Sequence, residues 1–299
     1  MTSNSLNIKN CVEKDVLEWF LDNGIDEAVS TSPVDKTAVG KPPISNVTID
    51  NVKQQSQAAT PPPAQVQPAV SAEDMAAEPL MGTAQALIEA KQRAADAKTL
   101  EELRATIQSF EGLAVKKTAM NMVFCDGNPD ADIMVIGEAP GADEDRQGKP
   151  FVGASGQLLD VVFSRIGLSR TAEDAKNGLY ISNILNWRPP GNRTPTPDEM
   201  RIAQPFIERH IQLAQPKILV LVGNTPMKSI LNTKEGIKKM RGQWHNYETV
   251  TAELPKLDQK IIAMPTFHPA FLLRNPGEKK TVWQDMIMIQ EKRKDLGLL

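Results

Sequence analysis

Three segments of the sequence combine side chains that can do chemistry with proline, and the first two also contain glycine. Residues 137–153 carry several carboxylates and one aromatic ring, and residues 183–193 begin with an asparagine and contain two arginines. Residues 266–276 contain His268, one of only three histidines in the chain. Carboxylates and imidazole are usual groups for proton transfer, and an amide can donate and accept hydrogen bonds at once. Glycine in residues 137–153 lets the backbone approach a ligand closely, and the three segments together are candidates for one binding and catalytic site.

A repeating strand–helix pattern must position these segments. Short apolar runs, typical of buried parallel strands, alternate with amphipathic stretches. This alternation predicts an α/β domain in which helices cover both faces of a parallel sheet. The expected strands are residues 133–137, 179–185, 217–223 and 260–264, and the expected helices are 156–166, 197–213, 225–231 and 280–296. Ligands bind beyond the carboxyl ends of strands in such sheets, and each of the three segments starts at or follows a strand end.

The chain before this pattern has a different composition. Apolar residues at helical spacing predict a short helix within residues 1–29. Residues 30–82 are rich in proline, alanine and glutamine and contain no aromatic side chain, so we interpret them as a disordered linker. We assign the catalytic domain to residues 83–299, opening with a helix over 84–97 and another from Thr99. The N-terminal helix is a candidate for recruiting a protein partner.

The overall composition excludes several classes of protein. A net charge of -3 and a pI near 5.8 argue against a wholly basic nucleic-acid-binding module, although they are compatible with a local basic patch. The sequence shows neither a bilayer-spanning apolar run nor a secretory signal, so we expect a cytoplasmic monomer without a membrane partner. Cys11 and Cys125 match neither a disulfide framework nor a CxxC motif.

Three motifs in the candidate segments carry a family resemblance. GEAPGADEDRQGKPFVGASGQLLD, SNILNWRPPGNRTPTPDE and MPTFHPAFLLRNP together resemble the family 4 uracil-DNA glycosylases, from about Thr118 to the C-terminus. The resemblance implies a three-layer α/β/α domain with a four-stranded parallel sheet, in agreement with the strand–helix pattern. It also implies a monofunctional enzyme of base-excision repair, whose partner is uracil-containing DNA and whose product is an abasic site.

The resemblance gives three residues a role around a uracil flipped out of DNA. Phe151 would stack on the base, Asn183 would read its O4 and N3–H edge, and His268 would donate to O2 and stabilise the departing anion. Each has a structural alternative, namely a core phenylalanine, a turn asparagine and a histidine satisfied within its own turn. We interpret His210, in a helix, and His245, in a loop, as structural.

The acidic cluster of the first motif admits more than one assignment. By resemblance, Glu138 belongs to the catalytic motif, and Glu144, in a looser loop, forms the pocket wall that excludes the methyl group of thymine. Either carboxylate near C1′ could position the water. Ala139, beside the base, occupies the position at which the best-known uracil glycosylases carry a water-activating aspartate. We expect Asp143 and Asp145 to be solvated charges.

The remaining candidates would contact the DNA outside the base pocket. Leu272 and Leu273 follow the His-Pro turn, where an apolar wedge would fill the space left by the flipped base, and we expect one leucine to point each way. The alternative is an ordinary helix start. Arginine and lysine side chains near phosphate would complete the surface, and the candidates are Arg274, Arg188, Arg193 and Lys149.

The sequence departs from the family at its iron–sulfur cluster. Typical members hold a four-iron cluster with four cysteines, but residues 110–117 contain none, and two other ligand positions correspond to Trp187 and approximately Ala203. We therefore predict no metal and no cofactor, with Leu113, Trp187 and Ala203 packed as a small apolar core. Residues 189–196 also lack the histidine-bearing insertion of a subgroup that links covalently to uracil, which favours simple hydrolysis.

Two other functions remain open for this fold. The first is a glycosylase for other deaminated bases, such as hypoxanthine. The second is a catalytically silent DNA-binding module, since related domains occur as parts of phage polymerases. The presence of Glu138, Phe151, Asn183 and His268 as a set favours an enzyme, and Asn183 favours uracil.

Overall fold

A computed structural model describes residues 82–299 of the chain. The predicted helix within residues 1–29 and, apart from Gly82, the predicted linker over residues 30–82 lie outside the described residues. The first described helix begins at Thr83. Among residues 82–299, no helix has both the length and the apolar character that crossing a bilayer requires.

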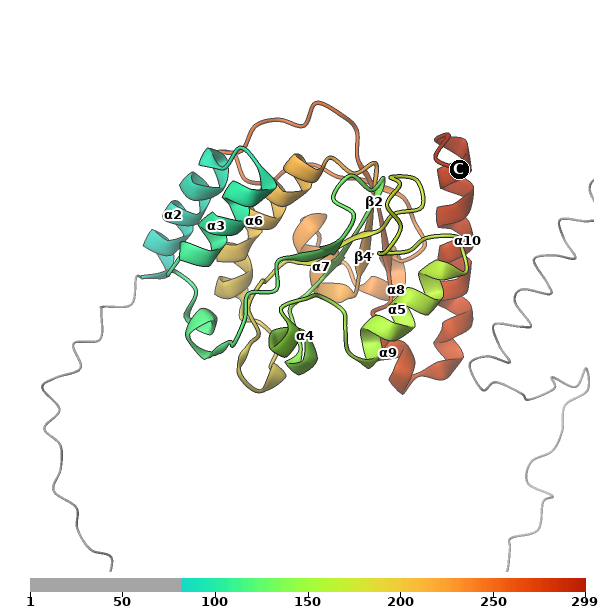
Figure 1. Cartoon of the computed structure of the whole chain (residues 1–299), viewed down its shortest axis with the longest axis horizontal. Coiled ribbons are helices and arrows are strands. Elements are labelled where there is room, and N and C mark those ends of the chain that lie inside the picture. The colour runs from blue at the N-terminus through green and yellow to red at the C-terminus, as the bar shows by residue number, and fades with distance from the viewer. Residues whose placement is uncertain (1–81) are drawn as a thin grey trace, which may run out of the picture. The chain divides into compact units, whose positions relative to one another are not determined.

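A mixed sheet forms the centre of the domain, with strand order β1-β3-β2-β4-β6-β5 (Figure 1). Its four central strands are parallel, and they are β3 (Tyr180–Asn183), β2 (Ile133–Gly137), β4 (Ile218–Val222) and β6 (Ile262–Thr266). Two short antiparallel strands, β1 (Cys125–Gly127) and β5 (His245–Asn246), extend its edges. The α/β fold with a four-stranded parallel core is therefore confirmed, and the edge strands are an addition. His245 lies in β5 rather than in the predicted loop.

Helices cover both faces of the sheet, and Figure 1 shows α2, α3 and α6 on one side and α5 and α10 on the other. All five strand residues of β2 and of β4 are buried, as expected for strands covered on both faces. The α-helices are α2 (Thr83–Asp96), α3 (Leu100–Ser109), α4 (Ala142–Gln147), α5 (Ala154–Ser164), α6 (Pro197–Ala214), α7 (Asn224–Ile230), α8 (Ile237–Met240), α9 (Pro269–Arg274) and α10 (Lys279–Asp295). Short 3-10 turns occupy Ala114–Thr118, Pro190–Asn192 and Pro276–Glu278.

The start of α6 illustrates how local sequence sets these boundaries. Thr196 accepts a hydrogen bond from the Glu199 backbone N–H at 3.2 Å, and Glu199 accepts one from the Thr196 N–H at 2.7 Å. This reciprocal capping box satisfies two backbone donors that a helix start otherwise leaves without partners. Pro197, at the first helical position, has its φ already fixed near the helical value.

His210 of α6 gives the fold a pH-dependent contribution to stability. Its ring stacks on Phe124 at 4.4 Å, and its Nε2 lies 2.7 Å from the Tyr180 hydroxyl. Complete burial lowers the pKa of His210 to about 3. Because the folded-state pKa lies below the unfolded value of about 6.5, this contribution is present above pH 6.5 and is lost as the pH falls toward the folded value.

We therefore expect His210→Gln to flatten the acid side of the stability profile. Urea unfolding at pH 7 and pH 5 should show a loss of unfolding free energy that is smaller in the variant, by up to about 2 kcal/mol. The comparison uses the difference between the two pH values, so any constant cost of the substitution cancels. Equal losses in the two proteins would show that folding does not lower the pKa of His210.

Candidate active site

A cavity of about 530 Å³ lies where the three segments meet, at the carboxyl ends of β2, β3 and β6. This is the location that the open α/β sheet predicts for a ligand. Most of the candidate residues reach it, and those that line it are Glu138, Ala139, Glu144, Phe151, Asn183, Arg193, His268 and Arg274.

Gly137, the last residue of β2, leaves room for two side chains of the site because it has no Cβ atom. It is paired in register with Asn183 at the end of β3. A Cβ atom built on Gly137 would lie 2.3 Å from the Asn183 Oδ1 and 2.6 Å from the Phe151 Cζ. Any larger residue would collide with both side chains, so glycine is what allows the amide and the ring to share this end of the cavity.

His268 is held as a neutral imidazole of one tautomer. It is the N-cap of α9, and its Nδ1 accepts a hydrogen bond from the Ala270 backbone N–H at 3.1 Å. An accepting Nδ1 leaves the proton on Nε2. Burial, assisted by the charge of Arg274, lowers the pKa of His268 to about 4, so the ring is an uncharged donor at neutral pH. The Phe151 ring centroid lies 5.6 Å from that of His268.

Glu144 lies in helix α4, not in the looser loop that we predicted. Its Oε1 accepts hydrogen bonds from the backbone N–H groups of Val152 and Gly153, both at 2.9 Å. Its Oε2 accepts from the Gly141 N–H at 3.1 Å. The carboxylate thus ties the segment after β2 to the residues that follow Phe151. Three backbone donors on its oxygens favour a positioning role over proton transfer.

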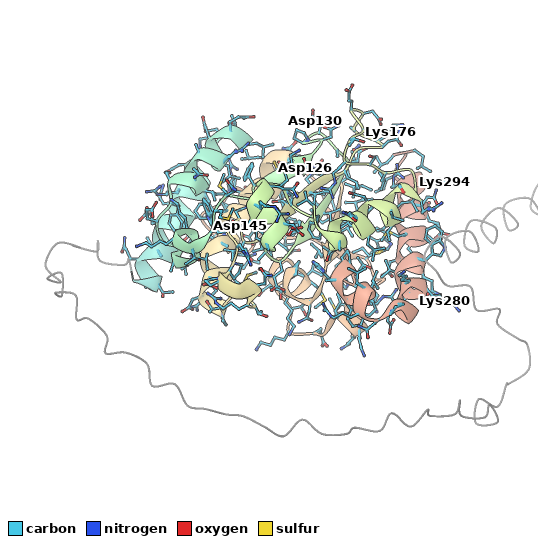
Figure 2. All side chains as sticks on the ribbon, turned by 60° about the horizontal axis from the view of Figure 1, so that its bottom comes forward. Asp126, Asp130, Asp145, Lys176, Lys280 and Lys294 are labelled. Carbon is cyan, nitrogen blue, oxygen red and sulfur yellow. The ribbon has the colours of Figure 1, made fainter. Side chains whose placement is uncertain are left out.

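Asp145 corrects a second expectation about the acidic cluster. It was predicted to be solvated, but it is 1% exposed (labelled in Figure 2). One carboxylate oxygen accepts from the backbone N–H groups of Met120 and Asn121, at 2.8 and 3.1 Å, and the other lies 3.8 Å from Nη1 of Arg188. Asp145 therefore anchors the chain before β1 and helps to hold Arg188 at the edge of the site.

The two candidate wedge residues both lie in helix α9, and their side chains differ in exposure. Leu272 is 1% exposed and packs among residues of α5 and α10, whereas Leu273 is 48% exposed. The expectation that the two leucines point in different directions is confirmed. The assignment of Leu272 to the DNA contact is wrong, because its side chain belongs to the core between α9, α5 and α10.

The candidate phosphate contacts are held by neighbouring acceptors. Arg193 forms two hydrogen bonds with the Glu199 carboxylate, at 2.6 and 2.8 Å. The Nε of Arg188 donates to Asn192 Oδ1 at 2.6 Å, and Lys149 Nζ lies 3.3 Å from Asp126 Oδ1. The Lys149 side chain is 60% exposed, and that of Arg193 is 42% exposed.

The cavity is also lined by residues that were not predicted as site residues. Ser155, Asn192 and Phe271 line it. Each lies within one of the three segments or two residues beyond it, so membership of those segments was the signal that pointed to them. Nothing in their types distinguishes them from ordinary loop and helix residues.

Comparison with known proteins decides the family. The family model for the Uracil DNA glycosylase superfamily matches residues 124–287. The chain belongs to the uracil-DNA glycosylase superfamily. Type-4 uracil-DNA glycosylases from Sulfurisphaera tokodaii and Archaeoglobus fulgidus are 34% and 33% identical to it, each over 198 residues. These matches cover 64% and 65% of this chain and 84% and 93% of the relatives. A DNA polymerase of Bacillus phage SP01 is 29% identical over 150 residues, which are 50% of this chain and 14% of the polymerase.

The type-4 relatives contradict the prediction of a protein without a cofactor, because they belong to the class whose typical members hold a four-iron cluster. We withdraw that prediction. The described residues do not themselves fit such a group: residues 82–299 contain no cluster of three or more His, Cys, Asp or Glu that could hold a metal ion. Leu113, Trp187 and Ala203 are buried in one apolar cluster.

Proposed function

We propose that this superfamily member is a uracil-DNA glycosylase that hydrolyses the N-glycosidic bond of uracil in DNA and leaves an abasic site for base-excision repair. The observation that carries the proposal is the cavity in which a buried amide, an aromatic ring and a neutral histidine donor converge. The type-4 relatives support the same activity. A base inside a duplex is inaccessible, so the uracil enters this cavity by flipping out of the stack.

Different pocket residues recognise the flat face of the uracil, its hydrogen-bonding edge and its small size at C5. Phe151 stacks on the base, and the Asn183 amide donates to O4 and accepts from N3–H. Cytosine presents the reversed donor and acceptor pattern, so the same amide disfavours it. Glu144, held by its three backbone donors, forms the wall against C5 that leaves no room for the methyl group of thymine.

The bond-breaking step uses charge stabilisation. As the N1–C1′ bond breaks, its electron pair moves to the uracil, and negative charge develops on O2. The His268 Nε2–H donates to that oxygen, where a fixed donor in a water-poor site is most effective. Water adds to C1′, and its proton balances the uracil anion. Glu138 is the carboxylate that positions this water, since Ala139 beside it carries no acid.

The surface around the cavity holds the DNA. Leu273 is the exposed apolar side chain that enters the space left by the flipped nucleotide. Arg274, Arg188, Arg193 and Lys149 contact phosphates and fix the register of the strand without reading sequence.

An oligonucleotide assay tests the proposed reaction. The full chain is incubated with labelled strands, single and paired, that carry one uracil, and abasic sites are then cleaved with alkali. We expect cleavage at uracil and none at thymine, cytosine or hypoxanthine in matched strands, with Asn183→Ala strongly reduced. Cleavage at hypoxanthine alone would overturn the account of Asn183. No cleavage by a folded protein that binds the DNA would favour the silent module.

A further inference from the structure

Phe151 has a backbone conformation that requires external support. Its φ is +53°, in the left-handed region, although it is not a glycine. Such a conformation costs a bulky L-residue about 1–3 kcal/mol and persists only where the surrounding structure holds it. The side chain is 6% exposed. The direction of the ring therefore depends on whatever fixes the peptide at this position.

Arg170 donates one hydrogen bond to each of the two carbonyls that flank the Phe151 Cα. Its Nη1 donates to the Pro150 carbonyl and its Nη2 donates to the Phe151 carbonyl, both at 2.9 Å. Arg170 lies between α5 and β3, outside the three candidate segments, and is not among the residues that line the cavity. It therefore contacts the backbone that carries the ring without forming part of the pocket wall.

The guanidinium is itself held by two carboxylates. Its Nε donates to Asp160 Oδ1 of α5 at 2.9 Å, and its Nη1 also donates to Asp126 Oδ2 of β1 at 3.1 Å (Asp126 is labelled in Figure 2). The Arg170 side chain is 11% exposed. A planar fork with several donors can bridge two carboxylates and two carbonyls in this way, whereas a lysine ammonium cannot reproduce the geometry.

Gly156 of α5 packs against the Phe151 carbonyl group. A Cβ atom built on it would lie 1.8 Å from the Phe151 carbonyl oxygen, so the first turn of α5 packs directly on that carbonyl. The peptide is confined between this turn and the Arg170 fork. Without the fork, the Phe151 backbone loses two of the hydrogen bonds that support its left-handed φ, and its ring can leave the direction that faces His268.

We propose that Arg170 is a positioning residue for base recognition, which acts through the Phe151 backbone to hold the stacking ring in place. This inference rests on the proposed function of the cavity. It assigns a role in uracil binding to a residue that does not line the base cavity. Its physical basis is the pairing of an unfavourable φ with a largely buried guanidinium that two carboxylates hold.

A double-mutant cycle on cleavage of uracil-containing DNA tests the proposal. Arg170→Gln is expected to lower kcat/KM by about 5- to 150-fold, the range for loss of one base-stacking contact. Phe151→Ala should cause a similar loss. Because both substitutions remove the same contact, the double variant should be no worse than Phe151→Ala alone, whereas a role independent of Phe151 would give multiplied losses.

Two further variants separate positioning from general stability. Arg170→Lys keeps the charge but not the fork, so it should lose activity as Arg170→Gln does, and it serves if the glutamine variant does not fold. Arg209→Gln is the matched control, since Arg209 is buried and donates twice to the Ala97 carbonyl between α2 and α3. We expect it to retain wild-type kcat/KM. Wild-type activity in both Arg170 variants, or multiplied losses in the cycle, would overturn this inference alone, whereas an inactive wild-type chain would overturn the proposed function.

Discussion

Replacing His268 with alanine is expected to lower the single-turnover rate of uracil release by about 10²–10³-fold, the usual loss when one oxyanion donor is removed. The physical reason is that the Nε2–H is fixed before the reaction, because Nδ1 is already occupied by the Ala270 N–H at 3.1 Å. Single-turnover conditions are required because product release limits the steady-state rate of many enzymes. His210→Gln is the matched control, since that buried histidine lies on α6 outside the cavity and should leave the rate unchanged.

The pH dependence of the same step distinguishes a neutral from a charged histidine. Burial lowers the pKa of His268 to about 4, so the ring stays neutral as the pH falls from 8 to 5. We therefore expect the difference in rate between wild type and His268→Ala to be constant over that interval. A difference that changes with an apparent pKa near the ordinary histidine value of about 6.5 would contradict a neutral donor.

The position of the site could be predicted because it depends on features that are local in sequence. Parallel strands covered on both faces appear as continuous apolar runs, and the loops that follow them gather at one edge of the sheet. The 133–137 run became β2 without a change of bounds, and residues at the ends of β2 and β3 meet in the cavity. Asn183 at the end of β3 and His268 just beyond the end of β6 both line the cavity at this edge of the sheet.

Short elements were the main source of error, for a physical reason. Asp145 and Leu272 lie in helices of six residues each, which are too short to show an apolar period. The inward turn of each side chain depends on what packs against the helix, namely residues 120–121 for Asp145 and helices α5 and α10 for Leu272. The edge strands β1 and β5 have three and two residues and give no alternation to detect.

The contacts that hold the Phe151 backbone could not be predicted from the sequence, for a different reason. The sequence Pro-Phe-Val does not indicate a left-handed φ at Phe151, because phenylalanine rarely adopts that region. The Arg170 contacts that hold it join residues 19 and 20 positions apart. Sequence alone therefore identified the ring of the pocket but not the interaction that directs it.

Gly137→Ala is expected to impair the pocket by displacing Asn183 and Phe151, although it removes no functional group. The new Cβ would lie 2.3 Å from Asn183 Oδ1 and 2.6–2.7 Å from the Phe151 ring, distances at which something must shift. Asn183 is 2% exposed and Phe151 6% exposed, so neither can relax into solvent without leaving its place in the cavity. We expect kcat/KM on uracil-containing DNA to fall by about 10²-fold or more, because stacking and edge recognition are lost together.

The stability change should be modest by comparison, since overpacking by one methyl group costs about 1–3 kcal/mol. Urea unfolding and the oligonucleotide assay on the same preparation separate the two effects. Gly236→Ala is the matched control, because a Cβ at Gly236 meets nothing within 4 Å. A folded Gly137→Ala protein with wild-type kcat/KM would show that uracil is not read between Asn183 and Phe151. A large loss confined to that variant would identify the end of β2 as the point where the fold itself sets the dimensions of the base pocket.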